Sequence, residues 1–187
     1  MFETTAIPGV LIYTPRVFTD PRGFFLESYN RDLWLQQGIE TVFVQDNHSR
    51  SCANTVRGLH FQLPPAAQVK LVRVVRGSVW DVAVDIREGS PTLGKWVGVE
   101  LTETNYKQLY IPAGMAHGFC VLSDEAELLY KTSHTYSPAH DRAIAWNDPQ
   151  IGVPWPVESP LLSQRDQGAP SLAEYLQGTH FVYGQEM

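Results

Sequence analysis

Short runs of strand-forming residues alternate with turn residues about every ten positions through most of this chain of 187 residues. Breaks at this spacing are typical of an antiparallel sandwich or barrel. The sequence therefore predicts a mainly β protein with a few short peripheral helices. We expect strands at residues 10–13, 16–19, 24–29, 41–45, 70–75, 78–86, 95–101, 108–111, 118–122, 126–132 and 142–146.

The N-terminal quarter contains a hairpin signal and a helix signal. The sequence Asp20-Pro21-Arg22-Gly23 fits a type I turn, which would join residues 16–19 to residues 24–29. Asn30 is suited to cap a short helix over residues 31–37, and Gly38 is suited to end it. After the strand at 41–45, the polar residues 49–55 read as a loop.

The middle of the chain predicts consecutive strands. In residues 78–86, apolar Trp80, Val82, Val84 and Ile86 alternate with a second set that includes two aspartates, the period of a half-buried strand. The dipeptide Arg76-Gly77 before it is a tight-turn signal.

The C-terminal part has a different character. Four prolines fall between positions 149 and 160, so we expect this segment to wrap over the rest of the protein in extended form. The sequence Ser171-Leu172-Ala173-Glu174 is a capping box, which predicts a short helix over residues 171–177. No linker or repeat is visible, so we expect a single domain over 1–187 with this wrapping segment at about 149–187.

Composition excludes several classes of function. A formal charge of −6 argues against general binding of nucleic acid or of an anionic membrane, both of which need a basic surface. No apolar run approaches the roughly 20 residues that span a bilayer, and the N-terminus lacks the pattern of a signal peptide. The two distant cysteines, Cys52 and Cys120, predict reduced thiols. We expect a soluble, cytoplasmic protein.

A short motif near residue 115 resembles the cupin jelly rolls. Pro112, Gly114 and His117 form P-x-G-x-x-H, the second cupin motif, whose histidine is often a metal ligand. The first cupin motif would place a second histidine two residues after His60, where this chain has Gln62, and no glutamate follows at ligand spacing. Since a catalytic zinc or iron site needs about three protein ligands, we predict a cupin-type barrel without a metal.

A pocket without a metal must use side chains for its chemistry. His60 can act as a base, and a carboxylate would fix its tautomer. Lys70 can stabilise an enolate oxygen, and a tyrosine hydroxyl can return a proton. The pattern does not choose among Tyr106, Tyr110, Tyr130 and Tyr136. Taken alone, these residues favour a structural interpretation, with His60 a core histidine and Lys70 a surface residue whose stem is buried.

Longer motifs make a specific resemblance. They occur in order from about residue 7 to about residue 170. They read QDNHS from Gln45, RGLHFQ from Arg57, KLVR from Lys70, DVAVDIR from Asp81, IPAGMAHGF from Ile111, LYKT from Leu129, WNDP from Trp146 and LSQRD from Leu162. This set resembles the family of dTDP-4-dehydrorhamnose 3,5-epimerases. The resemblance implies an antiparallel jelly roll, a homodimer and no metal or organic cofactor.

The resemblance also implies roles for individual residues. His60 would be the base that removes the protons at C3 and C5 of a dTDP-4-keto-6-deoxyhexose, and Asp166 would hold it. Lys70 would stabilise the enolate, and Tyr130 would return a proton on the opposite face. Tyr136 would stack on the thymine. The remaining positions that match the nucleotide-sugar site are Arg22, Glu27, Gln45, Asn47, Arg57, His117, Asp141 and Arg165.

Several positions depart from the family pattern or raise a geometric question. Val69 stands where the family usually has glycine before the lysine, Arg165 stands for a common lysine, and Asp141 for a commoner glutamate. Period-two pleating would place Arg57 and His60 on opposite faces of one strand, unless a bulge at Gly58 brings both to one side. By pattern alone Asp166 is an Asx-turn residue.

Four functions fit the sequence to different degrees. The first is epimerisation at both C3 and C5 of dTDP-4-dehydro-6-deoxy-D-glucose, a step toward dTDP-L-rhamnose. The second is epimerisation at one of these carbons, for a rarer deoxysugar. The third is a metal-dependent cupin enzyme, against which Gln62 argues. The fourth is a non-catalytic barrel that binds a sugar nucleotide.

Overall fold

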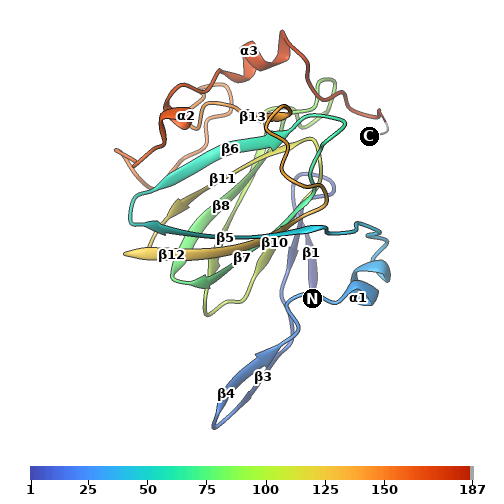
Figure 1. Cartoon of the computed structure of the whole chain (residues 1–187), viewed down its shortest axis with the longest axis vertical. Helices are drawn as coiled ribbons and strands as arrows, with labels where there is room; N and C mark the ends of the chain where they lie inside the picture. Colours follow the sequence, from blue (N-terminus) through green and yellow to red (C-terminus); the bar gives the residue numbers. More distant parts are fainter. Residues whose placement is uncertain (186–187) are drawn as a thin grey trace.

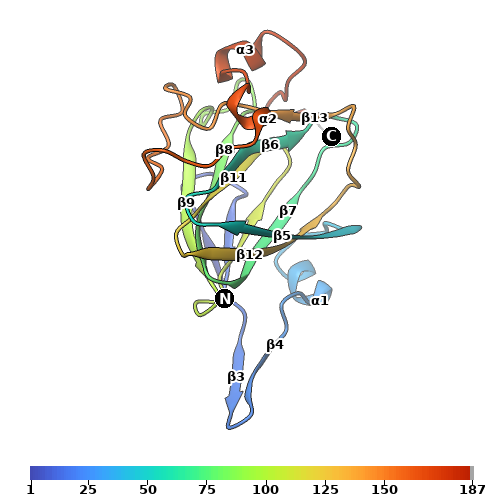
Figure 2. The same cartoon turned by 60° about the vertical axis from the view of Figure 1, so that its left-hand side comes forward.

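Two antiparallel sheets face each other in the computed structural model, which describes residues 1–185 (Figures 1 and 2). The six-stranded sheet has the order β1-β2-β10-β7-β12-β5, and the five-stranded sheet has the order β13-β6-β11-β8-β9. The strands of the first sheet are β1 (Phe2–Thr4), β2 (Leu11–Tyr13), β10 (Gln108–Ile111), β7 (Lys70–Arg76), β12 (Glu125–Thr132) and β5 (Gln45–Cys52). Those of the second are β13 (Asp141–Ala143), β6 (Val56–Gln62), β11 (Met115–Val121), β8 (Ser78–Asp85) and β9 (Trp96–Thr102).

Apolar residues from both sheets form the core between them. Val72 of β7 and Leu128 of β12 pack with Val79 of β8 and Phe119 of β11, and all four are at least 95% buried. The expected mainly β, jelly-roll architecture is confirmed. None of the helices within residues 1–185 has the length and apolar character needed to cross a bilayer.

Strand β8 is buried on both faces, so the prediction of a half-buried strand is wrong. Val79 and Ala83 face the core between the sheets, whereas Val82 and Val84 face a second apolar layer on the outside. The apolar half of the alternation lies under the C-terminal segment, and the half with the aspartates faces inward.

The C-terminal segment covers the outer face of the five-stranded sheet, as expected. Ile151, Leu172, Tyr175 and Phe181 pack there against Val82 and its neighbours. Helix α3 (Leu172–Leu176) begins at Ser171 with the predicted capping box. A further short helix, α2 (Gln164–Gln167), was not predicted, and its N-cap is Ser163.

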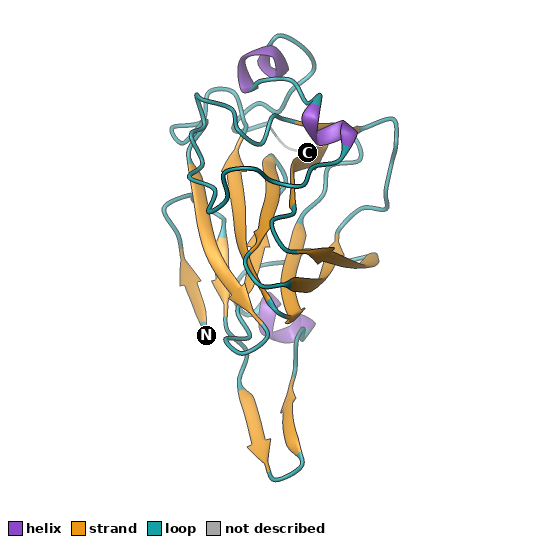
Figure 3. Ribbon diagram, turned by 90° about the vertical axis from the view of Figure 1, so that its left-hand side faces the viewer, coloured by secondary structure: helices purple, strands orange, loops and turns teal. Residues whose placement is uncertain are grey.

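The N-terminal hairpin extends away from the two sheets. Strands β3 (Val17–Asp20) and β4 (Gly23–Leu26) pair with each other alone and form the two-stranded projection at the bottom of Figure 3. Both the hairpin and the helix after it, α1 (Arg31–Leu35), agree with the sequence, and Asn30 caps α1.

Two predictions around the six-stranded sheet are corrected. Residues 41–44 are irregular and residues 49–52 are strand, because β5 pairs over its whole length with β12. The polar composition of β5 did not predict a strand at residues 49–52, because β5 is an edge strand and one of its sides is exposed. The turn at Arg76-Gly77 exists, but β7 and β8 lie in different sheets, so it carries the chain from one sheet to the other.

Candidate active site

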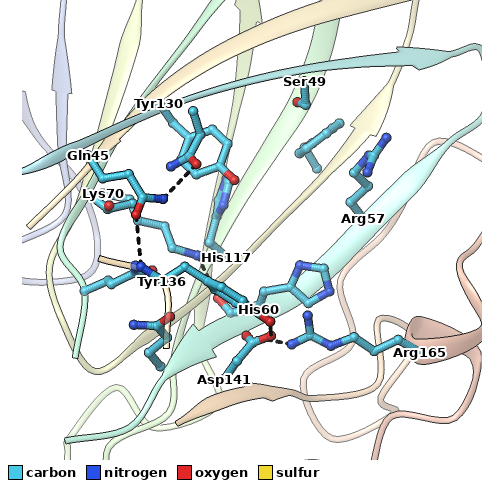
Figure 4. Close-up of a pocket in the computed structure, with 15 residues that line it drawn as sticks. Gln45, Ser49, Arg57, His60, Lys70, His117, Tyr130, Tyr136, Asp141 and Arg165 are labelled. Carbon is cyan, nitrogen blue, oxygen red and sulfur yellow. Dashed lines mark hydrogen bonds and ion pairs between the residues drawn. The ribbon is translucent and has the colours of Figure 1, made fainter. Parts of the chain in front are cut away.

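A cavity of about 230 Å³ opens between the two sheets (Figure 4). Strands β5, β7 and β12 line one side of it, and β6 and β11 line the other. Ten of the thirteen residues predicted for the site line this cavity: Gln45, Asn47, Arg57, His60, Lys70, His117, Tyr130, Tyr136, Asp141 and Arg165.

His60 and Asp166 form an ion pair beside the cavity. The Nε2 atom of His60 lies 2.6 Å from Oδ1 of Asp166, whose side chain is 2% exposed. Burial lowers the pKa of His60, and the hydrogen bond and charge of Asp166 act in the opposite direction. An imidazole that stays unprotonated near neutrality and is held by a carboxylate is suited to act as a base.

Helix α2 positions Asp166. Ser163 caps the helix by accepting a hydrogen bond from the backbone N–H of Asp166 at 3.1 Å. The Asx-turn interpretation is therefore wrong, because this residue lies inside a helix and its carboxylate turns toward the sheet. Burial raises the pKa of Asp166, but the hydrogen bond and charge of His60, the hydrogen bond with Ser163 and the charge of Arg165 together lower it, which keeps the carboxylate charged.

Lys70 is buried at the start of β7. Its exposed fraction is 8%, and its Nζ donates a hydrogen bond to the backbone carbonyl of His60 at 3.1 Å. Burial lowers the pKa of Lys70 to about 8, against the charges of Asp141 and Asp81, which raise it. Val69 before it does not take a positive φ, so valine is compatible with the backbone at this position.

Tyr130 enters the cavity from β12, across from His60 on β6 (Figure 4). Burial raises the pKa of the Tyr130 hydroxyl, and nearby Arg57 partly opposes this effect. The phenol therefore keeps its proton near neutrality and can donate it. Of the four tyrosines left open by the pattern, Tyr130 and Tyr136 line the cavity.

A bulge in β6 brings Arg57 to the same cavity as His60. Opposite β11, His60 pairs with His117 but Arg57 pairs with Phe119, so β6 carries one extra residue between them. Gly58 lies in this bulge with φ 147°, and a Cβ there would lie 2.6 Å from the Cα of Gly118. The expectation of a bulge at Gly58 is confirmed, and the close strand contact explains why glycine is needed.

Tyr136, Asp141 and Arg165 form a hydrogen-bonded group in the lining of the cavity. The Tyr136 hydroxyl donates to Asp141 at 3.2 Å, and the Arg165 guanidinium donates to the same carboxylate at 2.8 Å. Two of the three departures from the family pattern, Arg165 and Asp141, thus face each other, and the longer arginine reaches the shorter aspartate.

His117 forms a second histidine–carboxylate pair. Its Nε2 lies 2.8 Å from Oδ1 of Asp81, which is fully buried on β8. Asp81 is not among the site residues predicted from the sequence. The signal that could have found it is the alternation in residues 78–86, since Asp81 belongs to the half that faces inward. Ser49 was also missed; it lines the cavity, and its hydroxyl makes no hydrogen bond within the described residues.

The cupin metal positions do not fit a metal in this chain. The Nε2 atoms of His60 and His117 are each engaged by an aspartate, and Gln62 is hydrogen-bonded within the chain. Within residues 1–185, no group of three or more His, Cys, Asp or Glu side chains is arranged to hold a metal ion.

Arg22 and Glu27 do not line the cavity of their own chain. Arg22 lies at the tip of the projecting hairpin with a side chain that is 90% exposed, and its guanidinium pairs with Asp20 at 2.5 Å. Glu27 follows β4 at the base of the same hairpin.

Known proteins resemble this chain over most of its length. The family model described as dTDP-4-dehydrorhamnose 3,5-epimerase matches residues 4–174. Proteins of that description from Shigella flexneri and Salmonella typhimurium are 58% and 55% identical to it. These matches cover 87% and 92% of this chain and 90% and 95% of the relatives.

Solved structures of related epimerases superpose on most of this chain. The epimerase of Legionella pneumophila in complex with dTDP-4-keto-L-rhamnose superposes with a TM-score of 0.90 at 45% identity, over 92% of this chain and 93% of that one. A 4-keto-6-deoxy sugar epimerase from the novobiocin cluster of Streptomyces spheroides superposes with a TM-score of 0.94 at 42% identity, over 98% and 93% of the two chains.

Proposed function

The chain belongs to the dTDP-4-dehydrorhamnose 3,5-epimerase family, and on this premise we propose that His60, Lys70 and Tyr130 carry out the family's reaction in the cavity between the sheets. The activity is epimerisation of dTDP-4-dehydro-6-deoxy-D-glucose at C3 and C5, which gives dTDP-4-dehydro-L-rhamnose. The observation that carries the assignment of residues is that His60 and Tyr130 face one cavity from opposite sheets.

Proton removal falls to His60. A 4-keto group acidifies the hydrogens on both C3 and C5, so one base can serve both carbons. With Nε2 directed to Asp166 at 2.6 Å, the lone pair of the neutral imidazole lies on Nδ1, which acts as the base. Asp166 then stabilises the imidazolium that forms.

Lys70 stabilises the enolate. Removal of a proton at C3 or C5 places negative charge on the C4 oxygen, and a buried ammonium stabilises that charge more than it would in water. The Lys70 side chain is held by the carbonyl of His60, so base and electrophile occupy fixed positions relative to each other.

Tyr130 returns the proton. Inversion requires removal from one face of the sugar ring and delivery to the other, hence two groups of opposite role on opposite sides of the substrate. A tyrosine whose pKa is raised by burial is protonated at neutral pH and can serve as the acid.

The remaining cavity residues bind the nucleotide sugar. Arg57 and Arg165 supply guanidinium groups, which suit the two phosphates. The exposed ring of Tyr136 is the surface on which the thymine stacks. Gln45, Asn47, His117 and Asp141 complete the binding shell. We propose no metal or organic cofactor, and a cytoplasmic location.

The functional unit is a homodimer in this proposal. Arg22 and Glu27 match family positions of the substrate site yet lie outside the cavity of their own chain. Phe24 and Phe25 on the same hairpin are 58% and 65% exposed, and such apolar residues favour burial against another chain. Exchange of hairpins between two copies would place Arg22 and Glu27 at the partner's site.

Proton NMR in D2O tests the proposal. The purified, chelator-treated protein is incubated with dTDP-4-dehydro-6-deoxy-D-glucose, and we expect loss of the C3 and C5 proton signals. Capture of the product by a dTDP-4-dehydrorhamnose reductase would establish the rhamno configuration. Loss of one signal would indicate an enzyme acting at one carbon. Exchange only after added metal would revive the metal-dependent alternative, and binding without exchange would leave a binding protein.

A further inference from the structure

Gln62 has a different use from the cupin histidine whose place it takes. It is the last residue of β6, lines the cavity, and is 2% exposed. Its Nε2 donates hydrogen bonds to the backbone carbonyls of Ala66 at 2.7 Å and Thr135 at 3.3 Å. Its Oε1 accepts a hydrogen bond from the backbone N–H of Ser137 at 2.8 Å. Both donors of the amide are thus used by the chain itself, which leaves little for a ligand.

Two of these partners lie on either side of Tyr136. Gln62 holds the carbonyl before this residue and the N–H after it, while the N–H of Tyr136 itself donates to Oε1 of Gln45 at 2.9 Å. Tyr136 is 58% exposed, so packing does not fix its ring, whose hydroxyl donates a hydrogen bond to Asp141 at 3.2 Å. The backbone anchors from two cavity glutamines fix the position from which the ring extends.

We propose that Gln62 is a positioning residue for the nucleotide base, because it fixes the backbone on both sides of Tyr136 and so directs the Tyr136 ring toward the base. The inference rests on the proposed function, in which Tyr136 stacks on the thymine. Histidine has only two ring nitrogens and glutamate has no donor, so neither can donate to two carbonyls and accept from an N–H. Glutamine satisfies all three groups.

Loss of the Gln62 hydrogen bonds should weaken binding of the nucleotide rather than slow proton transfer. Lys70 follows the loop that contains Ala66, but β7 pairs with both β10 and β12 at this residue. Lys70 is therefore held without Gln62. His60 is fixed by Asp166 and by its own strand pairing.

The test is Gln62→Met, which keeps the length and burial of the side chain and removes its hydrogen bonds. We expect KM for the dTDP-sugar and the inhibition constant of dTDP to rise about tenfold, with kcat within about twofold. The inhibition constant of inorganic pyrophosphate, which has no base, should not change. A fall in kcat with KM unchanged, or equal weakening of dTDP and pyrophosphate, would overturn the inference.

A double-mutant cycle shows whether Gln62 acts through Tyr136. In a Tyr136→Ala background, Gln62→Met should weaken dTDP less than about twofold further. The matched control is Gln108→Met, since Gln108 is also 2% exposed but donates to the carbonyl of Ser28 outside the cavity. It should lower Tm while its effect on dTDP adds to that of Tyr136→Ala. Additive effects for Gln62 would reject the inference, whereas a wild-type protein that does not bind dTDP would reject the proposed function itself.

Discussion

Asp166 holds the ring of His60 from a helix 106 residues further along the chain, with 2.6 Å between Nε2 and Oδ1. The carboxylate is buried and the imidazole is partly exposed, so the pair joins the interior to the cavity. This geometry fixes which ring nitrogen carries the proton, and in the proposed mechanism the other nitrogen removes the proton from the substrate.

The first prediction concerns the acid limb of the pH–rate profile. Burial lowers the pKa of His60 below its ordinary value of 6.5, and a base works only when unprotonated. The wild-type kcat should therefore exceed half of its maximum at pH 6.5 and fall to half only at lower pH. Asp166→Asn removes the charge that raises the pKa of His60, so the acid limb should move to lower pH. The maximal kcat should fall at least about tenfold. A coupled reductase assay measures both, and a wild-type limb above pH 6.5 would contradict the assignment.

Lys70 sets the alkaline limb in the second prediction. The ammonium has a pKa of about 8, and above that pH it loses the charge that stabilises the enolate. We expect kcat to fall as pH rises through about 8, and Lys70→Met to slow exchange about 100-fold with little effect on dTDP binding. Lys70→Arg keeps its charge at high pH, so whatever activity it retains should lack this limb. An affinity loss without a rate loss in Lys70→Met would make Lys70 a phosphate contact.

The sequence predicted the residues that meet at the cavity better than the strands on which they lie. His60, Lys70 and Tyr130 stand in long motifs, so the resemblance placed them without any knowledge of register. Strand β5 was missed at residues 49–52, because its outward side chains are polar and its strand character depends on pairing with β12. Local propensity contains no information about such a distant partner.

Asp81 and Gln62 show a second limit of the sequence. Asp81 was seen as the polar half of an alternating strand, and only the C-terminal cover makes both halves buried. Gln62 was noticed for the histidine that it replaces, but its hydrogen bonds join two segments far apart in the chain, residues 62–66 and residues 135–137. The sequence placed Arg57 at the site only on the condition that β6 has a bulge at Gly58. Glycine is compatible with a bulge but does not require one.

Tyr130→Phe separates proton removal from proton return, which is the third prediction. The variant keeps the base and the enolate stabiliser but loses the acid on the opposite face. Wash-out of C3 and C5 protons into D2O should persist at a measurable rate, while formation of the epimerised product falls more steeply, by about 100-fold. Proton NMR follows exchange and product in the same sample. Equal loss of both would mean that Tyr130 positions the base or the sugar.

The fourth prediction concerns the C-terminal cover. Phe181 is 4% exposed against the outer face of the five-stranded sheet, and the backbone N–H of Glu88 donates to its carbonyl at 2.8 Å. Phe181→Ala should lower the free energy of unfolding by about 3–5 kcal/mol, while kcat at 25 °C stays near wild type because the cavity lies on the opposite face of this sheet. Tyr183→Ala, at a side chain that is 46% exposed, should cost less than about 1 kcal/mol. Urea unfolding measures both, and equal losses would place the stabilising contact elsewhere.

The fifth prediction tests whether Arg22 acts on the partner's site. Arg22→Ala homodimers keep His60 but lack the arginine at both sites, and His60→Ala homodimers lack the base at both. Each should be nearly inactive alone. In a mixed dimer, the subunit with intact His60 receives Arg22 from the His60→Ala partner, so one complete site forms.

Co-expression of the two variants at equal levels should give about half mixed dimers and so about one quarter of wild-type activity. Two different affinity tags allow the mixed dimer to be purified and assayed directly. If Arg22 served its own chain, every site would lack either the base or the arginine, and the mixed dimer would be no more active than the two homodimers.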